Sequence, residues 1–360
     1  MSITEQQVNE AIKGFVDPHL EKDLVAAKSI KSIAIDGDRV TVDVVLGYPA
    51  KGYAATLADD LKKRIDALGA KATVKVTSKI VSHAAQKSLK PIDNVRNIIA
   101  VASGKGGVGK STVAVNLALA LAAEGATVGI LDADIYGPSQ PRMLGIHGQP
   151  ESKDGKSLEP MLSHNVQAMS IGFLIDEETP MIWRGPLVTQ ALEQLLNDTN
   201  WRDLDYLVID LPPGTGDAQL TLAQKVPVSG AVIVTTPQDI ALLDARKGLK
   251  MFQKVEVPVL GIVENMSIHI CSNCGHEEHI FGEGGGVRMA EQYDVDFLGG
   301  IPLDKSIREN ADGGKPSVVA DPDGRIAQTY REIARRTAAK LSLQAKEYSQ
   351  KFPNIVISNN

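Results

Sequence analysis

A glycine-rich loop between an apolar run and a helix-forming run constrains the fold of this chain more than any other feature. Residues 98–102 are all apolar, and residues 104–112 read Gly-Lys-Gly-Gly-Val-Gly-Lys-Ser-Thr. The second segment fills the pattern G-x-x-x-x-G-K-[ST], in which backbone N–H groups surround a phosphate at the start of a helix. Strand, loop and helix therefore follow one another as in a nucleotide-binding α/β domain.

Each residue of this loop has an expected contact or conformation. Lys110 is expected to reach the β and γ phosphates, Ser111 to ligate Mg²⁺, and Thr112 to donate to the α phosphate. Glycine suits such a loop because it reaches positive φ without a Cβ clash. The predicted nucleotide-binding residues here are Gly104, Lys105, Gly106, Gly107, Val108, Gly109, Lys110, Ser111 and Thr112.

Lys105 is the unusual member of the loop. An ordinary phosphate-binding loop needs no cation there, and a lysine beside Lys110 adds electrostatic repulsion. Lys105 either serves a phosphate that its own loop does not cradle or is a solvated surface lysine. Residues 104–112 resemble the deviant phosphate-loop ATPases, whose motif reads K-G-G-x-G-K-[ST]. In that group the early lysine reaches the partner's nucleotide, so the resemblance implies a homodimer.

Composition and charge exclude several classes of protein. The 360 residues are 43% hydrophobic and 23% charged, as in a globular chain of about two domains. No apolar stretch approaches a membrane span, and residues 1–9 do not resemble a signal sequence, so a cytoplasmic location is expected. The net charge of −6 and the weak basic pattern of residues 341–360 favour neither nucleic acid nor membrane as a partner.

Hydrophobic periodicity predicts a small α/β domain over residues 1–81. Its expected helices are residues 5–15 and 54–68, and its expected strands are residues 30–35, 40–44 and 72–76. Residues 82–96 are polar, contain Pro91 and show no period, which indicates a linker.

Residues 97–345 carry the pattern of a larger α/β domain, followed by a C-terminal tail over residues 346–360. Helix-like segments separate most of the β-rich runs, which are residues 98–102, 127–131, 206–209, 231–235, 259–263 and 297–301. Such runs are typical of parallel strands that are buried on both faces. The predicted fold class is therefore α/β: a mostly parallel P-loop NTPase sheet covered by helices, preceded by a small α/β N-terminal domain.

Two acidic motifs follow predicted strands, and ligands of parallel sheets lie beyond the carboxyl ends of the strands. Asp134 is placed to orient the attacking water, and Asp210 is expected to act as the Walker B carboxylate near Mg²⁺. Gly214 could offer its N–H group to the γ phosphate. The predicted catalytic set is thus Lys105, Lys110, Asp134 and Asp210, with a helix-cap or turn role as the alternative for each aspartate.

The chain contains only two cysteines, Cys271 and Cys274, three positions apart. A structural disulfide is disfavoured in a reducing compartment, which leaves metal binding or redox chemistry. With His276 and His279 the pair could form a zinc site within one chain, although four ligands within nine residues is tighter than the usual pattern. Alternatively, two such pairs across a dimer axis supply four thiolates, which suit an iron–sulfur cluster and also zinc.

The order of motifs resembles the Mrp/ApbC family of iron–sulfur cluster carrier ATPases over about residues 97–310. These motifs are KGGVGKST, LDADIYGPS, WRGP, DLPPGTGD, TTPQD and VENMSIHICSNCGH. The N-terminal unit resembles the small iron–sulfur assembly domain often fused ahead of this ATPase. The resemblance implies a homodimer that binds ATP, Mg²⁺ and a labile [4Fe-4S] cluster, hydrolyses ATP slowly and passes the cluster to apo iron–sulfur proteins, with iron–sulfur scaffold proteins as further partners.

The resemblance also assigns individual residues. It places Asp134 and Asp210 in the two nucleotide-sensing switches, and it assigns the adenine to Asn265, Pro302 and Asp304. The cluster would be held by Cys271 and Cys274. Ordinary turn roles are the alternative for the three adenine residues.

Two other functions remain open from the sequence. One is a MinD/ParA-like positioning ATPase with structural zinc at the cysteine pair. The other is a redox ATPase, similar to the nitrogenase reductases, which would retain its cluster through redox cycling.

Overall fold

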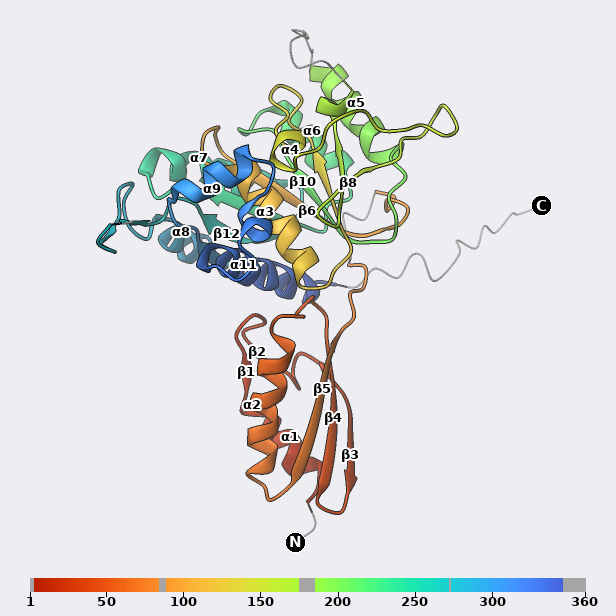
Figure 1. Cartoon of the computed structure of the whole chain (residues 1–360), viewed down its shortest axis with the longest axis vertical. Coiled ribbons are helices and arrows are strands. Elements are labelled where there is room, and N and C mark those ends of the chain that lie inside the picture. The colour runs from red at the N-terminus through yellow and green to blue at the C-terminus, as the bar shows by residue number, and fades with distance from the viewer. Residues whose placement is uncertain (1–2, 84–88, 175–184, 272, 346–360) are drawn as a thin grey trace, which may run out of the picture.

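The structure is a computed structural model that describes residues 3–83, 89–174, 185–271 and 273–345. It consists of a narrow N-terminal domain stacked end to end with a larger domain (Figure 1). The expected tail, residues 346–360, lies outside the described residues, as do Trp183 and Arg184 of the WRGP motif.

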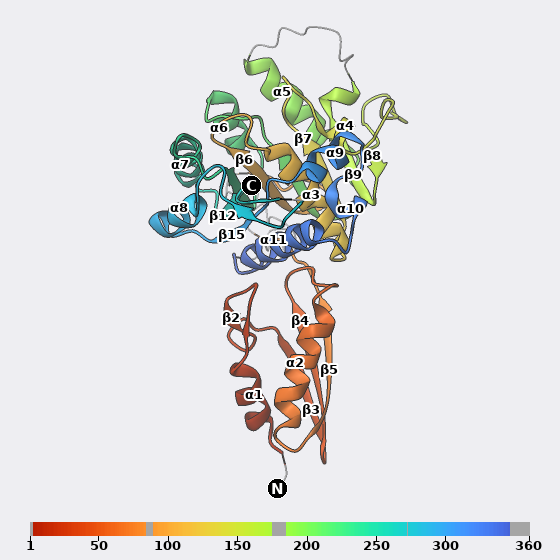
Figure 2. The same ribbon diagram turned by 60° about the vertical axis from the view of Figure 1, so that its left-hand side comes forward.

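The N-terminal domain is a three-stranded sheet with two helices on one face (Figures 1 and 2). Its elements are α1 (Glu5–Lys13), β3 (Ile30–Asp36), β4 (Arg39–Leu46), α2 (Ala54–Asp66) and β5 (Lys71–Ser78). Strand β4 is central, antiparallel to β3 and parallel to β5, and its alternating apolar side chains face the helices. Both expected helices and all three expected strands are present. The two-residue strands β1 (Val16–Asp17) and β2 (Lys22–Asp23) are too short to show a period, and they were not predicted.

The larger domain is built on an eight-stranded sheet in the order β15-β12-β11-β6-β10-β7-β9-β8, within which only β8 is antiparallel. The strands are β6 (Val95–Ser103), β7 (Val128–Asp132), β8 (Met161–Ser163), β9 (Val166–Ser170), β10 (Leu204–Asp210), β11 (Gly230–Thr235), β12 (Val259–Glu264) and β15 (Phe297–Gly300). The predicted mostly parallel sheet is confirmed, and all six expected strands belong to it. Strands β8 and β9 were not predicted. Because β6 begins at Val95, the last two residues of the expected linker belong to this strand, and Val95 pairs with Leu204 of β10.

Helices pack on both faces of this sheet (Figure 2). They are α3 (Lys110–Ala123), α4 (Gln140–Met143), α5 (Gly185–Asn197), α6 (Asp217–Lys225), α7 (Asp239–Lys254), α8 (Gly285–Tyr293), α9 (Lys305–Asp312), α10 (Ser317–Ala320) and α11 (Arg325–Ser342), with a 3₁₀ turn at Ile171–Phe173. None of the described helices is long and apolar enough to cross a bilayer.

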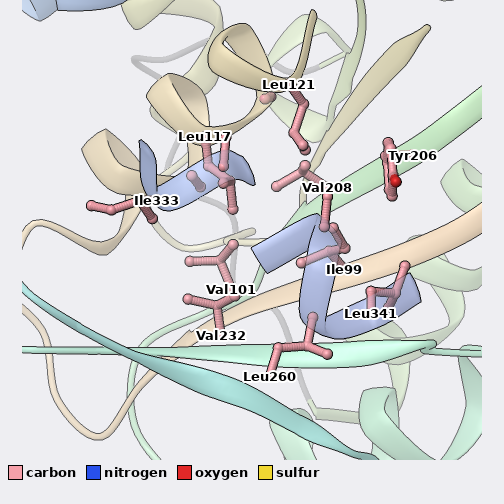
Figure 3. Close-up of a cluster of buried hydrophobic side chains, with 14 of the residues drawn as sticks. Ile99, Val101, Leu117, Leu121, Tyr206, Val208, Val232, Leu260, Ile333 and Leu341 are labelled. Carbon is pink, nitrogen blue, oxygen red and sulfur yellow. The ribbon is translucent and has the colours of Figure 1, made fainter. Parts of the chain in front are cut away.

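Helix α3, which follows the phosphate-binding loop, is buried over most of its length between the sheet and α11. Figure 3 shows its Leu117 and Leu121 among side chains of the central strands, such as Val101 and Val208, and Ile333 of α11. Each fully buried aliphatic side chain stabilises the fold by about 1.5–3 kcal/mol. This packing fixes the helix that carries the loop.

The far end of α3 contacts the N-terminal domain through Glu124, which is 2% exposed. One carboxylate oxygen accepts hydrogen bonds from Arg331 Nε and Arg335 Nη1 of α11, both at 2.7 Å. The other oxygen accepts from the Gly52 N–H group at 2.8 Å, and the Glu124 carbonyl accepts from the Lys51 N–H group at 3.1 Å. Both oxygens of this buried charge are thereby satisfied, one by α11 of the same domain and the other by the N-terminal domain.

His19 forms the second polar contact at the junction. Its ring is 2% exposed, and its Nε2 atom lies 3.0 Å from Glu332 Oε2 and 3.1 Å from Arg335 Nε. Hydrogen bonding to His19 and Arg335 holds the pKa of Glu332 at about 2. The loop helix α3 and the N-terminal domain are therefore joined through one continuous polar network.

Candidate nucleotide site and cysteine hairpin

The glycines of the phosphate-binding loop are needed for different reasons. Gly107 and Gly109 have φ values of 82° and 80°, a region that favours glycine. A Cβ atom on Gly109 would also collide with the Asn265 side chain, whereas one on Gly107 would have open space around it. A Cβ atom on Gly104 would collide with the backbone of Asp244 in α7, so that glycine permits close packing of loop and helix.

Lys110 and Asp210 form a buried ion pair beside the loop. Their side chains are 5% and 0% exposed, and Lys110 Nζ contacts Asp210 Oδ1. The same Nζ atom lies 3.2 Å from the Ser111 hydroxyl. Since β6 and β10 are neighbours in the sheet, the ends of these two strands place the three predicted phosphate and Mg²⁺ residues together.

Asp132 lies opposite Asp210 in the pairing of β7 with β10 and organises the loop that follows β7. Its Oδ2 atom accepts hydrogen bonds from Ser139 N at 2.9 Å, Gln140 N at 3.0 Å and Ser170 Oγ at 3.2 Å. Complete burial, and then the charge of Asp210, raise its pKa to about 7. Asp132 thus closes residues 133–139 into a fixed loop.

Asp134, the predicted water-orienting residue, lies within that loop and is half-buried. Burial raises the pKa of its carboxyl group, and the positive charge of Lys110 opposes this shift. Gly214, expected to offer its N–H group to the γ phosphate, donates that group to the Ser103 carbonyl at 3.0 Å in the structure without nucleotide. Lys105 is half-buried, and its carbonyl accepts a hydrogen bond from Ser103 Oγ at 2.9 Å.

The residues expected to hold adenine have structural contacts of their own. Asn265 is 7% exposed and donates from Nδ2 to the Val108 carbonyl at 2.8 Å, which ties the end of β12 to the phosphate-binding loop. Asp304 caps α9 by accepting a hydrogen bond from Ser306 N at 2.8 Å. Pro302 lies between β15 and this cap. Their roles toward adenine remain predictions.

Cys271 and Cys274 lie at the tip of a short hairpin formed by β13 (His269–Ile270) and β14 (Glu277–Glu278). Both thiols are free; Cys271 is half-buried and Cys274 is exposed. The Cys271 N–H group donates to the His276 carbonyl at 2.9 Å, which closes the tip. The N–H groups of Asn273 and Cys274 lower the pKa of the Cys271 thiol, and this favours the thiolate that binds metals.

Two histidines near this hairpin, His269 and His279, are directed toward backbone carbonyls. Nδ1 of His279 lies 3.0 Å from the Ser267 oxygen, and Nδ1 of His269 lies 3.1 Å from the Leu303 oxygen. Within the described parts of the chain, no three His, Cys, Asp or Glu side chains converge on a metal position. The zinc site within one chain therefore stays a prediction, as does the shared iron–sulfur site.

Comparison with known proteins gives the family of this chain. A family model described as NUBPL iron-transfer P-loop NTPase matches residues 94–338. The chain belongs to the NUBPL iron-transfer P-loop NTPase family. A second model, described as iron–sulfur cluster assembly protein, matches residues 5–77. The family resemblance expected from the motifs is confirmed.

Relatives of this NUBPL-family chain include proteins that align with most of its length. It is 63% identical over 265 residues to the iron–sulfur cluster carrier protein of Pseudomonas fragi, covering 73% of this chain and 92% of that one. It is 52% identical over 342 residues to the iron–sulfur cluster carrier protein of Escherichia coli K12, covering 93% and 92%. A solved structure of an Archaeoglobus fulgidus nucleotide-binding protein in complex with ADP is 40% identical, with a TM-score of 0.57 and coverage of 66% and 92%.

The site of this family member fits a nucleotide with its Mg²⁺ ion. The space above Gly107 is open, and the loop amides lie at the N-terminus of α3. The Ser111 hydroxyl and the Asp210 carboxylate both lie next to Lys110 Nζ, and they are oxygen groups of the kind that Mg²⁺ prefers.

Two residues of this NUBPL-family site were not predicted from the sequence. No role was predicted for Asp132, which lies two residues before Asp134 in the LDADIYGPS motif, although it anchors the loop after β7. Gln140 was not singled out, yet its side chain donates to Asp210 Oδ2 at 2.8 Å. No sequence motif marks this glutamine, so the contact can be recognised only from its position in the fold.

Proposed function

We propose that this chain is an ATP-binding and ATP-hydrolysing carrier that takes up a labile [4Fe-4S] cluster on Cys271 and Cys274 and delivers it to apo-proteins. The observation that carries the proposal is the link between the two sites: Asn265 bonds the Val108 carbonyl of the phosphate-binding loop, and the cysteine hairpin begins at His269. The names of the Pseudomonas fragi and Escherichia coli relatives support the carrier function.

The nucleotide half of the proposal depends on an exchange of partners by Lys110. Its Nζ atom contacts Asp210 in the structure, so the lysine must leave that carboxylate to reach the β and γ phosphates. The phosphate charge replaces the Asp210 charge as its partner, and Asp210 is released for the metal. Ser111 and Asp210 would hold Mg²⁺, which would neutralise part of the phosphate charge.

The remaining nucleotide roles follow from position in the loop and its neighbours. The amides of residues 104–112 bind phosphate, and Asp134 orients the attacking water. Lys105 extends toward the nucleotide of a second copy, and Asn265 with residues 302–304 borders the adenine. The ATPase is a domain of its own over residues 97–345. A linker over residues 82–96 joins it to the N-terminal domain, residues 1–81, which contacts the client proteins.

The cluster is the cargo of the carrier. One chain contributes two thiolates at the tip of the hairpin, so a homodimer contributes the four that a [4Fe-4S] cluster needs. Iron–sulfur scaffold proteins would supply the cluster, and apo iron–sulfur proteins would receive it. Because Cys274 is exposed, an acceptor's thiols can approach the cluster and replace those of the carrier.

The test is anaerobic reconstitution with iron and sulfide, followed by transfer to an apo-enzyme with and without ATP. Cys271→Ala and Cys274→Ala are expected to abolish loading and to leave ATP binding intact. Lys110→Ala is expected to abolish ATP binding and to leave loading intact. Full cluster loading of both cysteine variants, or tightly bound zinc that excludes the cluster in wild type, would refute the proposal.

A further inference from the structure

Gln140 joins the two residues that are proposed to hold Mg²⁺. It begins α4, directly after the loop that Asp132 closes, and it is 1% exposed. Its Nε2 group donates to Asp210 Oδ2 at 2.8 Å and to the Ser111 carbonyl at 3.1 Å. One buried amide group therefore connects the end of β10 with the first turn of α3.

The two oxygens of the Asp210 carboxylate have different partners. Lys110 occupies Oδ1, and Gln140 occupies Oδ2. When Lys110 moves to a phosphate, Oδ1 loses its partner while Oδ2 stays bonded. A carboxylate held by one oxygen cannot turn freely, so its other oxygen keeps its direction.

The oxygen of the Gln140 amide gives a second, independent indication of a ligand. Oε1 is buried and has no hydrogen-bond partner among the described residues. A buried carbonyl oxygen without a partner is costly, and such an oxygen accepts hydrogen bonds only. The position therefore suits a hydrogen-bond donor that comes with a ligand.

We propose that Gln140 is a positioning residue for Mg²⁺: its amide N–H groups tie the Asp210 carboxylate to the Ser111 backbone, and its buried Oε1 accepts a hydrogen bond from the hydrated cation. This role rests on the proposed nucleotide-binding function. Because the backbone N–H group of Gln140 donates to Asp132 Oδ2, cation binding is coupled to the loop that carries Asp134.

The test compares cation affinity with nucleotide affinity in the full chain. ATP binding is measured by calorimetry in EDTA, and Mn²⁺ binding to the protein–ATP complex is measured by electron paramagnetic resonance. Gln140→Leu is expected to bind ATP without cation within about twofold of wild type and to bind Mn²⁺ about tenfold more weakly, the effect of one hydrogen bond to a charged group. Gln140→Met serves as a second variant of similar length in case the leucine variant folds poorly.

Gln167→Leu is the matched control, because Gln167 is a buried glutamine whose side-chain amide bonds the Arg202 backbone through both its oxygen and its nitrogen, away from Asp210. It is expected to lower the melting temperature without changing the Mn²⁺ affinity. Unchanged Mn²⁺ affinity in the Gln140 variants would overturn the proposed role of Gln140. Equal losses of Mn²⁺ affinity and of ATP affinity in EDTA would overturn it as well. Wild-type protein that binds no ATP would overturn the proposed function as well.

Discussion

Lys110 and Asp210, one hundred positions apart in the chain, form a buried ion pair between the phosphate-binding loop and the end of β10. This ion pair holds the Lys110 side chain close to the place where the β and γ phosphates are expected to bind. Removing one member leaves the other charge buried without a partner, which is far more costly than removing both.

The stability of Lys110 variants tests this pairing. Lys110→Met is expected to lower the free energy of unfolding by about 3 kcal/mol, because Asp210 remains buried without a cation. Adding Asp210→Asn to that variant removes the charge and should recover most of the loss. Urea unfolding of wild type, both single variants and the double variant measures the coupling. Additive losses would show that the two side chains do not stabilise each other.

The pH dependence of stability tests the environment of Asp132. Its pKa is raised from 3.8 to about 7, so between these values the folded chain holds a proton that the unfolded chain has released. The contribution of Asp132 to the free energy of unfolding is therefore complete below pH 3.8. It is lost as the pH rises through 7, at up to about 1.4 kcal/mol per pH unit. Asp132→Asn should flatten this part of the profile. An identical slope in the variant would contradict the assignment.

The domain junction predicts a large effect at Glu124. Glu124→Gln is expected to cost about 3 kcal/mol and to expose the junction to proteases, because Arg331 and Arg335 lose a buried counter-charge. Glu309→Gln is the control: Glu309 pairs with Lys305 on the surface, and its loss should change stability by about 0.5 kcal/mol or less. Similar losses in the two variants would refute the importance of the junction.

The two kinds of glycine in the loop predict an unequal response to alanine. Gly107→Ala meets open space and is expected to cost about 1–2 kcal/mol of backbone strain. Gly104→Ala drives a Cβ atom into the Asp244 backbone, and a loss of about 3 kcal/mol is expected because α7 must shift. Thermal unfolding compares the two. A smaller loss for Gly104→Ala would contradict the close packing of loop and α7.

The fold could be predicted from the sequence wherever a segment carries a signal of its own. The central strands are nearly continuous apolar runs, and the helices of the N-terminal domain have apolar residues at helical spacing. Strand β9 has no such signal, because Gln167 and Ser170 occupy two of its five buried positions. Its place in the sheet depends on pairing with β7 and not on its own composition.

The candidate site also combines residues that a local sequence pattern predicts with residues that only the tertiary fold brings together. The loop pattern gives Lys110 and Ser111 directly, since their chemistry depends on residues a few positions away. Gln140 reaches Asp210 only because the fold brings α4 to the end of β10, 70 positions further along the chain. Glu124 likewise meets Arg331 across 207 positions. Contacts of this range depend on the tertiary fold and leave no local pattern.

The proposed carrier function requires two copies of this chain to share one cluster through Cys271 and Cys274. Native mass spectrometry of the anaerobically reconstituted protein tests it most directly, because it weighs the chains and the cluster together. We predict a species of two chains with one [4Fe-4S] cluster, absent from Cys274→Ser. A single chain that carries a whole cluster, or a zinc ion on each chain, would rule out the shared cluster.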